Sequence, residues 1–261
     1  MDANIAQSLS HFDTISLETL NSKAAMLERL DQKYIVTAKT LQPAFERFRE
    51  TFDVLEIDGK RAFTYATRYF DDPAQNAYYD HHQGRRKRCK VRIRHYVDAG
   101  FSFLEVKLKD RRDVTVKKRL SLPDPGQDLD DTCLHFIDRC HEEMYGAPLA
   151  RPLRPVIAMQ YERITLVAKS GGERMTIDTR LGFSAVDAGR TVAPDMFIIE
   201  TKSARGNGQA DAILRGLHLH PTKRCSKYCI GMAALHQVDR ANRFLPALRK
   251  LGLTNRAQRA E

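Results

Sequence analysis

Cationic and apolar residues alternate along two neighbouring segments of the chain. In residues 90–96, KVRIRHY, Lys90, Arg92 and Arg94 alternate with Val91, Ile93 and His95, and residues 104–109, LEVKLK, repeat the alternation. Successive side chains of a strand point to opposite faces of the sheet, so this period of two predicts two strands. The turn residues between them, 98–100, predict a β-hairpin. Its charged residues are expected to share one face, and its apolar residues the other.

Further strands and helices follow from the same kind of pattern. Strands are expected at residues 30–36, 63–70, 113–120, 157–169, 174–181 and 196–202. Helices are expected twice within residues 2–27, then at 40–52 with Pro43 in the first turn, at 129–145 and over most of 209–251. Strands joined mostly by turns, with helices at both ends and in the middle, favour an α+β fold built on an antiparallel barrel or sandwich.

The domain organisation is expected to be simple. No internal repeat and no low-complexity linker divides the sequence. We expect one main domain at residues 27–235, an N-terminal helical extension at residues 1–26 and a C-terminal helical tail at residues 236–261.

Positive charge is concentrated in one part of the 261-residue chain. Residues 81–120 hold fourteen Lys and Arg against four Asp and Glu, and this excess equals the net charge of +10. Such a balance favours a polyanionic partner: nucleic acid, a phosphorylated metabolite, polyphosphate or an anionic membrane surface. No segment has the roughly eighteen apolar residues of a spanning helix, and the N-terminus lacks a signal-peptide pattern. We therefore expect a cytoplasmic protein, attached at most peripherally to the membrane through a partner.

Later strands also place charges at alternating positions. Arg163 lies on one such strand, Arg180 is expected to share a face with Asp178, and Lys202 shares one with Glu200. For a single strand, a solvated outer face is the ordinary explanation. If these faces point into a barrel, two cations about 4 Å apart repel by about 4 kcal/mol at an effective dielectric constant of 20. Such a cluster needs acids, water, a metal ion or an anionic ligand, so a multi-phosphate ligand is the physical expectation.

Carboxylates on these strands are candidate metal ligands. Triphosphate chemistry generally uses a divalent cation with oxygen ligands, and Glu105, Asp178 and Glu200 lie among the cations. For Glu105 an ion pair with a neighbouring Lys or Arg is an equal alternative. For Glu200 we favour the metal.

An ordered series of short motifs resembles the VTC domain of polyphosphate polymerases. The series comprises RLDQKY at residues 29–34, YFDDP at 69–73, KVRIRHY at 90–96, LEVK at 104–107, YER at 161–163, TID at 176–178, IETK at 199–202 and SKY at 226–228. Each motif alone is weak, but the ordered combination is specific and covers roughly residues 27–235. The family is similar to the CYTH-type triphosphate tunnel metalloenzymes. The resemblance therefore implies an α+β fold with a closed antiparallel eight-stranded β-barrel, a basic tunnel inside it and flanking helices.

The resemblance also implies an activity. It is the transfer of the terminal phosphoryl group of ATP to a growing polyphosphate chain, with Mn²⁺ or Mg²⁺ as the cofactor. The resemblance assigns phosphate contacts to cations from the whole domain: Lys33, Arg92, Arg94, Lys107, Arg163, Arg180, Lys202 and Lys227. The charge pattern adds three phosphate-binding candidates: Lys90, Lys109 and Lys118.

The metal is assigned by the resemblance to Glu200. Further candidate ligands are the carboxylates of the neighbouring strands: Asp31, Glu105 and Asp178. Asp31 is a departure, because the family usually carries the longer Glu two residues before the Lys of the opening strand.

Other functions stay open at this point. The same tunnel with water as acceptor would hydrolyse a triphosphate, and a member without metal-dependent turnover would only bind polyphosphate. The cationic run RRKR at residues 85–88 can contact nucleic acid. We interpret it as a solvated loop at the tunnel mouth and do not expect a nucleic-acid partner. The histidines at residues 81, 82, 218 and 220 lack a third metal ligand at matching spacing.

Overall fold

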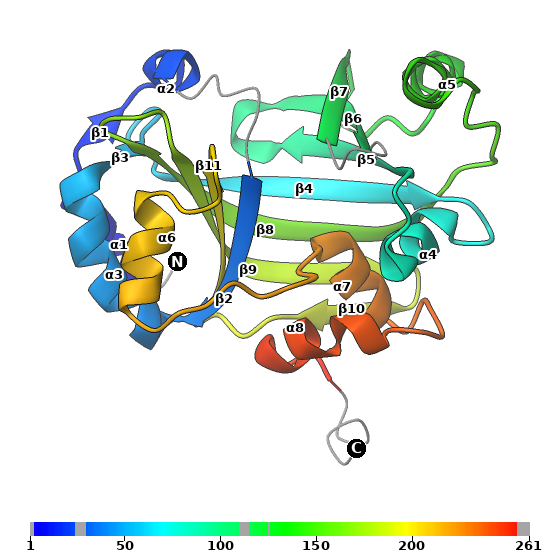
Figure 1. Ribbon diagram of the computed structural model, residues 1–261. Coiled ribbons are helices and arrows are strands. Elements are labelled where there is room, and N and C mark those ends of the chain that lie inside the picture. The colour runs from blue at the N-terminus through cyan, green and yellow to red at the C-terminus, as the bar shows by residue number, and fades with distance from the viewer. Residues whose placement is uncertain (1–2, 24–29, 110–114, 125, 255–261) are drawn as a thin grey trace.

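A large antiparallel sheet forms the centre of the molecule (Figure 1). The computed structural model describes residues 3–23, 30–109, 115–124 and 126–254. Eight strands are hydrogen-bonded in the order β2-β11-β9-β8-β4-β5-β6-β7, each antiparallel to its neighbours. Their bounds are β2 Leu30–Thr37, β4 Ala62–Asp71, β5 Arg88–Tyr96, β6 Phe101–Lys109, β7 Thr115–Leu122, β8 Arg154–Ala168, β9 Arg174–Ala185 and β11 Met196–Ser203.

Three short strands extend this sheet. β1 (Thr14–Ile15) pairs in parallel with β3 (Phe52–Leu55), which in turn pairs with β8, and β10 (Ala188–Thr191) pairs with β9. Their sequences are too short to show an alternation, and the sequence pattern did not predict them.

The sheet does not close into a barrel. Among the residues that the structure describes, no ladder joins β7 to β2, so these two strands end the main strand order. An α+β fold with a large antiparallel sheet and flanking helices is confirmed, whereas the prediction of a closed barrel is wrong. Residues 117–119 of β7 are three consecutive cations. They place charge on both faces of the strand, which is typical of an edge strand.

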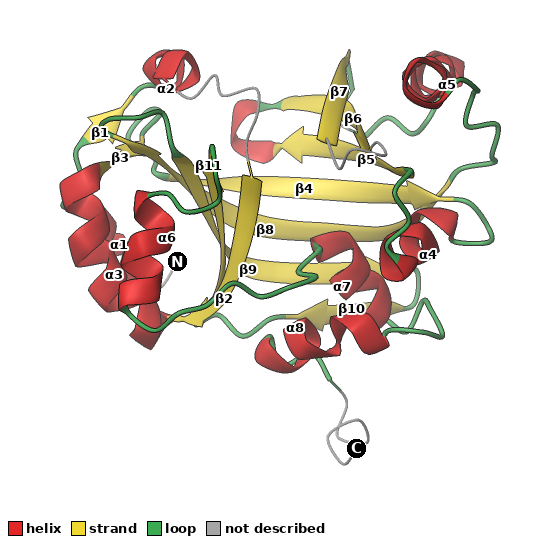
Figure 2. Ribbon diagram, in the orientation of Figure 1, coloured by secondary structure: helices red, strands yellow, loops and turns green. Residues whose placement is uncertain are grey.

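Helices cover both faces of the sheet (Figure 2). Their bounds are α1 Ala3–Ser10, α2 Leu17–Lys23, α3 Ala38–Thr51, α4 Asn76–Gln83, α5 Asp131–Tyr145, α6 Gln209–Gly216, α7 Lys227–Ala234 and α8 Leu245–Lys250, with 3₁₀ segments at Val97–Ala99 and Asn242–Phe244. Helices α1, α3 and α6 lie together at one end of the sheet, and α4, α7 and α8 lie near the other (Figure 1).

Two apolar cores lie on the outer face of the sheet. One joins Tyr34 and Ile177 of the sheet to Phe48 of α3, and the other joins Val91 and its neighbours on β5–β7 to Ile137 of α5. The apolar halves of the alternating strands are therefore buried, as hydrophobic burial favours. The charged halves necessarily point to the opposite, inner face.

Part of the inner face is covered by α7. This helix is buried along its whole length except for the partly exposed Lys227, and it packs on the ends of β8 and β9. A Cβ atom added at Gly231 would lie 2.6 Å from Cδ1 of Phe183, so a residue without a side chain is needed here. The remainder of the inner face carries the charged residues.

Some helix bounds differ from the expected ones. Helix α3 begins at Ala38 because Thr37 caps it, with Thr37 and Thr40 forming a capping box. Pro43 consequently lies beyond the first turn. The expected helical region at residues 209–251 is divided into α6, α7 and α8. Residues 1–2, 24–26 and 255–261 of the expected extension and tail, and residues 113–114 of an expected strand, lie outside the described residues. No helix in the described ranges combines the length and apolarity needed to cross a membrane.

Candidate phosphate-binding site

Strand register brings the charged residues of distant segments onto one inner face. Lys90 is paired with Lys107 across β5 and β6, Arg92 is paired with Glu105, and Lys33 is paired with Glu200 across β2 and β11. We name this surface the basic face. Its cations are Lys33, Lys90, Arg92, Arg94, Lys107, Lys117, Arg119, Arg163, Arg174, Lys202 and Lys227, and its carboxylates are Asp31, Glu105, Asp178 and Glu200.

Glu105 is surrounded by three cations. Its carboxylate lies 2.7 Å from Nε of Arg92, 2.9 Å from Nζ of Lys117 and 3.7 Å from Nη1 of Arg94, and its side chain is 1% exposed. Burial alone would raise the pKa of Glu105, but Arg92, Arg94 and Lys117 outweigh it and hold the pKa far below its usual range. Glu105 is therefore ionised and balances part of the charge of β5 and β7.

Asp178 holds a second cluster of charges. Arg163 donates two hydrogen bonds to its carboxylate, at 2.6 Å and 2.8 Å, and Nζ of Lys227 lies 2.5 Å from Oδ2. Burial opposes ionisation of Asp178, but these two cations lower its pKa far below the usual range. Such bidentate pairs fix guanidinium orientation. Asp178 thus joins β8 to α7.

Glu200 lies between two lysines. Its carboxylate is 2.7 Å from Nζ of Lys33 and 3.2 Å from Nζ of Lys202. Burial would raise the pKa of Glu200, but Lys202 and Lys33 lower it well below its usual value. For Lys202 desolvation outweighs the attraction of Glu200, and it lowers the pKa of Lys202 to about 8. Asp31 stands opposite Lys202 in the strand register.

Lys107 interacts with charges on both sides of the basic face. Desolvation lowers its pKa to about 8, and repulsion by Lys33 of β2 and Lys90 of β5 acts in the same direction. The side chain of Lys107 is exposed, so water reaches its ammonium group and weakens these effects. β2 is the first strand of the order and β6 the last but one, yet their charges are close enough to repel one another.

Three buried polar atoms of the basic face have no hydrogen-bond partner among the described residues. They are Nε of Arg94, Oη of Tyr161 and Oγ1 of Thr176. A buried polar group without a partner costs roughly 1–3 kcal/mol. Thr176 is paired with Glu200, and Tyr161 lies under Arg163 and Lys227. A ligand with several acceptor oxygens, such as a phosphate chain, can accept hydrogen bonds from all three.

Two residues expected in the site lie on the outer face. Lys118 is paired with Val106, and its ammonium contacts Glu143 of α5. Arg180 is exposed and forms an ion pair with Glu162 at 3.2 Å. We correct the candidate set by removing both.

Three cations of the basic face were missed, Lys117, Arg119 and Arg174, and another cation lies at the margin. Lys117 was absent from the candidate set, although its register partner is Lys107 and it contacts Glu105. Its position opposite Lys107 was the available signal, but three consecutive cations obscured the phase of β7. Lys109 is half-buried at the end of β6, where it is paired with Arg88.

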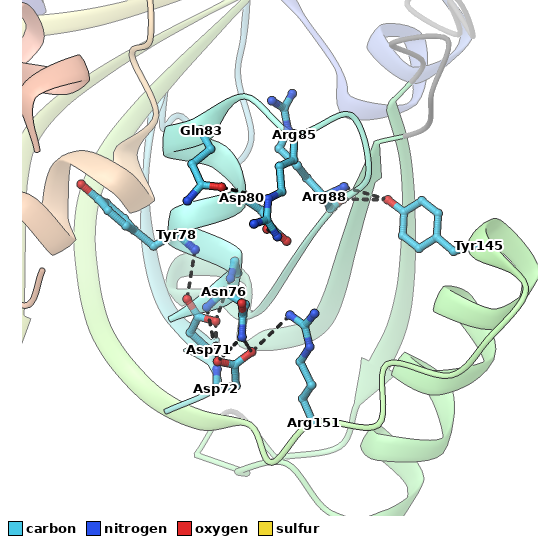
Figure 3. A network of polar contacts seen from close by, with 11 residues as sticks. Asp71, Asp72, Asn76, Tyr78, Asp80, Gln83, Arg85, Arg88, Tyr145 and Arg151 are labelled. Atoms are coloured by element: carbon cyan, nitrogen blue, oxygen red, sulfur yellow. Dashed lines mark hydrogen bonds and ion pairs between the residues drawn. The ribbon is translucent and has the colours of Figure 1, made fainter. Parts of the chain in front are cut away.

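The Asp-Asp pair of the YFDDP motif positions helix α4 (Figure 3). Asp71 accepts hydrogen bonds from the backbone N–H groups of Ala77 and Tyr78, and Asp72 accepts one from Asn76. The N-cap residue of α4, Gln75, forms no side-chain cap. The two acids instead accept hydrogen bonds from the first N–H groups of the helix. Each acid therefore fixes the start of α4 at the end of β4.

Asp71 also fixes α7. Tyr228 donates a hydrogen bond of 2.6 Å from its hydroxyl to Oδ2 of Asp71, and its ring stacks on Tyr69. Lys90 donates to Oγ of Ser226, the residue that caps α7. Since Lys227 is the first residue of α7, these contacts hold its ammonium beside Asp178.

A cavity of about 340 Å³ lies beside this network and is separate from the basic face. Within it, Arg151 pairs with Asp72 at 3.2 Å and Arg85 pairs with Asp80 at 3.0 Å (Figure 3). The RRKR run thus begins with an internally paired arginine. Because acids balance these arginines, the cavity offers less surplus positive charge than the basic face, and we do not assign the phosphate ligand to it.

The carboxylates fit a divalent cation whose other ligands are phosphate oxygens. In the described ranges, no three His, Cys, Asp or Glu side chains gather to hold a metal ion alone. The side chains of Glu105 and Asp178 are 1% and 0% exposed, whereas that of Glu200 is 15% exposed, so Glu200 is the more accessible carboxylate. Mg²⁺ is usually bound by one or two carboxylates together with substrate phosphates and water. Glu200, with Asp31 as its diagonal neighbour across β2 and β11, is the set that fits this chemistry.

A known structure shares the fold, and another is similar at a lower score. HpAC1 from Hippeastrum superposes with a TM-score of 0.51 at 14% sequence identity, covering 79% of this chain and 96% of that protein. The PH1819 protein from Pyrococcus horikoshii OT3 gives a TM-score of 0.42 at 16% identity, covering 77% of this chain and 96% of its own. At these identities the likeness concerns the fold alone, and HpAC1 is the match that supports it.

Sequence comparison identifies the family. No curated protein matches the chain. The family model of the VTC domain matches residues 28–236, which agrees with the range of 27–235 expected from the motifs. The match contains every residue of the basic face, from Asp31 to Lys227. The resemblance to this family is confirmed, and the chain belongs to the VTC domain family.

Proposed function

We propose that this protein transfers the terminal phosphoryl group of ATP to the end of a polyphosphate chain. The observation that carries the proposal is the basic face itself, which holds eleven cations and four carboxylates. Such an excess is stable only beside counter-charge. A phosphate chain supplies one negative charge or more per unit, and its oxygens match the unpartnered donors of Arg94, Tyr161 and Thr176.

The residues of the chain supply positioning and electrostatic stabilisation. Arg92, Arg94 and Arg163 present guanidinium groups that are oriented by Glu105 and Asp178, so little reorganisation is needed when charge develops on the transferring group. Lys33 and Lys107 approach from opposite sides of the basic face. Phosphoryl transfer requires charge neutralisation and alignment more than a protein nucleophile.

The reaction balances without a protein base. The bond between the γ-phosphorus of ATP and the bridging oxygen breaks, and ADP leaves with that oxygen. A terminal oxygen of the acceptor chain forms the new bond to phosphorus. This oxygen is already deprotonated near neutral pH, so no proton has to be removed.

Mn²⁺ or Mg²⁺ would neutralise phosphate charge when it is bound. Glu200 and Asp31 are the residues proposed to hold it. Lys33 and Lys202 keep Glu200 ionised and orient its carboxylate.

Hydrolysis of a triphosphate is a second candidate. HpAC1, which shares the fold, is described as having a dominant triphosphatase activity. The same binding residues would serve if water replaced the polyphosphate chain as the acceptor.

One pair of assays separates the candidates. The protein is incubated with ATP and Mn²⁺, and polymer formation and phosphate release are measured in the same sample. Polymer accumulation supports the transferase, whereas phosphate release without polymer supports the hydrolase. Lys107→Ala should abolish either activity, and Lys118→Ala, a lysine of the outer face, should leave it unchanged. Full activity of Lys107→Ala, or tripolyphosphate binding without any turnover, would reject the proposed transferase.

A further inference from the structure

Four aromatic side chains gather on the inner face where the β5–β6 hairpin ends. Tyr96 lies 4.8 Å from Phe101 and 6.0 Å from Phe103, and Tyr65 lies 5.0 Å from Tyr96, measured between ring centroids. By strand register, Phe103 is opposite Arg94, and Phe101 is opposite Tyr96. We name Tyr65, Tyr96, Phe101 and Phe103 the aromatic platform.

The aromatic platform adjoins the cations of the basic face. The guanidinium groups of Arg94 and Arg163 lie 5.5 Å and 5.2 Å from the ring centre of Tyr65, and that of Arg119 lies 4.8 Å from the ring centre of Phe103. An aromatic ring beside phosphate-binding arginines is the arrangement that holds a base and its phosphates together.

Core packing accounts for Tyr65, which packs against the core that contains Tyr161, but not for the other three rings of the platform. Tyr96, Phe101 and Phe103 belong to none of the buried cores found among the described residues, and Phe101 is 42% exposed. Exposing large aromatic rings to water is unfavourable unless a partner covers them. Because the neighbouring cations require an anion, the fitting partner combines a flat ring system with a phosphate chain.

We propose that the aromatic platform stacks the base of a nucleoside triphosphate, and this inference rests on the proposed function. The phosphates then extend from Arg94 towards Lys90 and Lys107, four residues and about 13 Å further along β5. The terminal phosphate therefore lies at the end of the basic face nearest α7. Stacking does not depend on the hydrogen-bond pattern of a base, so ATP and GTP should bind with similar affinity.

The test compares ligands with and without a base. Dissociation constants of ATP, GTP and tripolyphosphate are measured by calorimetry on the full chain without divalent metal. Phe101→Ala should weaken ATP and GTP binding by about tenfold, the size expected for one stacked base. It should change tripolyphosphate binding less than twofold. Phe101→Tyr, which keeps an aromatic ring, should restore ATP binding.

A matched control is Leu134→Ala on α5. Leu134 is 38% exposed, so this variant also removes a partly exposed apolar side chain, but away from the platform. It should leave all three affinities unchanged. Unchanged tripolyphosphate binding also shows that Phe101→Ala is folded, and Phe101→Leu replaces it if that variant does not fold.

The outcomes separate this inference from the proposed function. If Phe101→Ala binds ATP as tightly as the wild type does, or loses ATP and tripolyphosphate equally, the platform does not hold a base. The proposed function would survive that result. If the wild type binds neither ATP nor tripolyphosphate, the proposed function fails and this inference fails with it.

Discussion

Nζ of Lys33 lies 2.7 Å from the carboxylate of Glu200, directly across the β2–β11 pair. Lys202 approaches the same carboxylate from two residues further along β11. Glu200 thus either serves as a counter-ion for two lysines or uses them to remain ionised for a metal ion. Substitution distinguishes these roles, because only the second makes the side chain necessary for metal-dependent turnover.

Glu200→Gln should separate phosphate binding from metal-dependent activity. The substitution removes one negative charge and leaves Lys33 and Lys202 without their carboxylate. Binding of tripolyphosphate in the absence of metal should therefore become tighter by a few-fold, which corresponds to a screened charge pair of about 1 kcal/mol. Turnover of ATP with Mn²⁺ should fall at least about tenfold. Mutation of a residue that only supports a metal ligand already lowers metal affinity or activity by about 10–100-fold. Glu162→Gln on the outer face is the control. Wild-type turnover by Glu200→Gln would leave Glu200 with only the counter-ion role.

Affinity for tripolyphosphate should fall above pH 8. Desolvation lowers the pKa of both Lys202 and Lys107 to about 8. The charged form of each lysine binds the anion, so both are competent below this pH and lose their charge as the pH rises through it. Well above pH 8, the logarithm of the affinity should decrease by about two per pH unit, one for each lysine.

Lys202→Arg is the matching control for this pH dependence. Arginine keeps its charge throughout this range, so the slope should decrease to about one per pH unit. Any titration of the ligand affects both proteins equally and cancels in the comparison. Identical slopes in the two proteins would show that Lys202 does not titrate in the free site.

Adjacent lysines of β7 should behave differently. Lys117 contacts Glu105 on the basic face, whereas Lys118 contacts Glu143 on the outer face. Lys117→Ala should weaken tripolyphosphate binding by about fivefold, the value of one partly exposed charge pair of about 1 kcal/mol. Lys118→Ala should have no effect. A fluorescent polyphosphate displaced by tripolyphosphate provides the affinities, and equal effects of the two variants would contradict the assigned faces.

The hydrogen bond between Tyr228 and Asp71 should contribute to stability. Both residues are buried, and burial raises the pKa of Asp71. Tyr228→Phe should lower the free energy of unfolding by about 1–3 kcal/mol, because Asp71 loses a buried donor. Urea denaturation measures the loss, with Tyr79→Phe on α4 as the control. A loss no larger than that of the control would mean that Asp71 is held by the backbone of α4 alone.

Gly231→Ala should displace α7. The added Cβ would lie 2.6 Å from Cδ1 of Phe183, so the helix or the ring must move. Overpacking of this kind costs about 1–3 kcal/mol. Tripolyphosphate binding should weaken too, because Lys227 is carried by α7. Stability and binding equal to those of the wild type would show that the contact relaxes without moving the helix.

Alternation along single strands predicted much of the basic face. Lys90, Arg92 and Arg94 share a face because the period of a strand is a local property of the chain. The same reasoning failed for Arg180. Its φ of 52° and the register shift opposite residues 160–162 mark a β-bulge, which reverses the alternation after Asp178. A bulge depends on the partner strand and leaves little trace in the sequence.

Other features depend on contacts between distant segments. Helix α4 was not predicted, because the residues that complete its first turn, Asp71 and Asp72, precede the helix by several positions. Whether a sheet closes depends on strand tilt and stagger, which alternation does not record. The three cations around Glu105 come from β5 and β7, and only the register shows that they converge.

A crystal structure with tripolyphosphate tests the central claim most directly. The account predicts a phosphate chain on the basic face, with its oxygens within hydrogen-bonding distance of Arg92, Arg94, Arg163 and Lys202. A phosphate chain bound instead at the exposed RRKR run, with the basic face occupied by water alone, would contradict it.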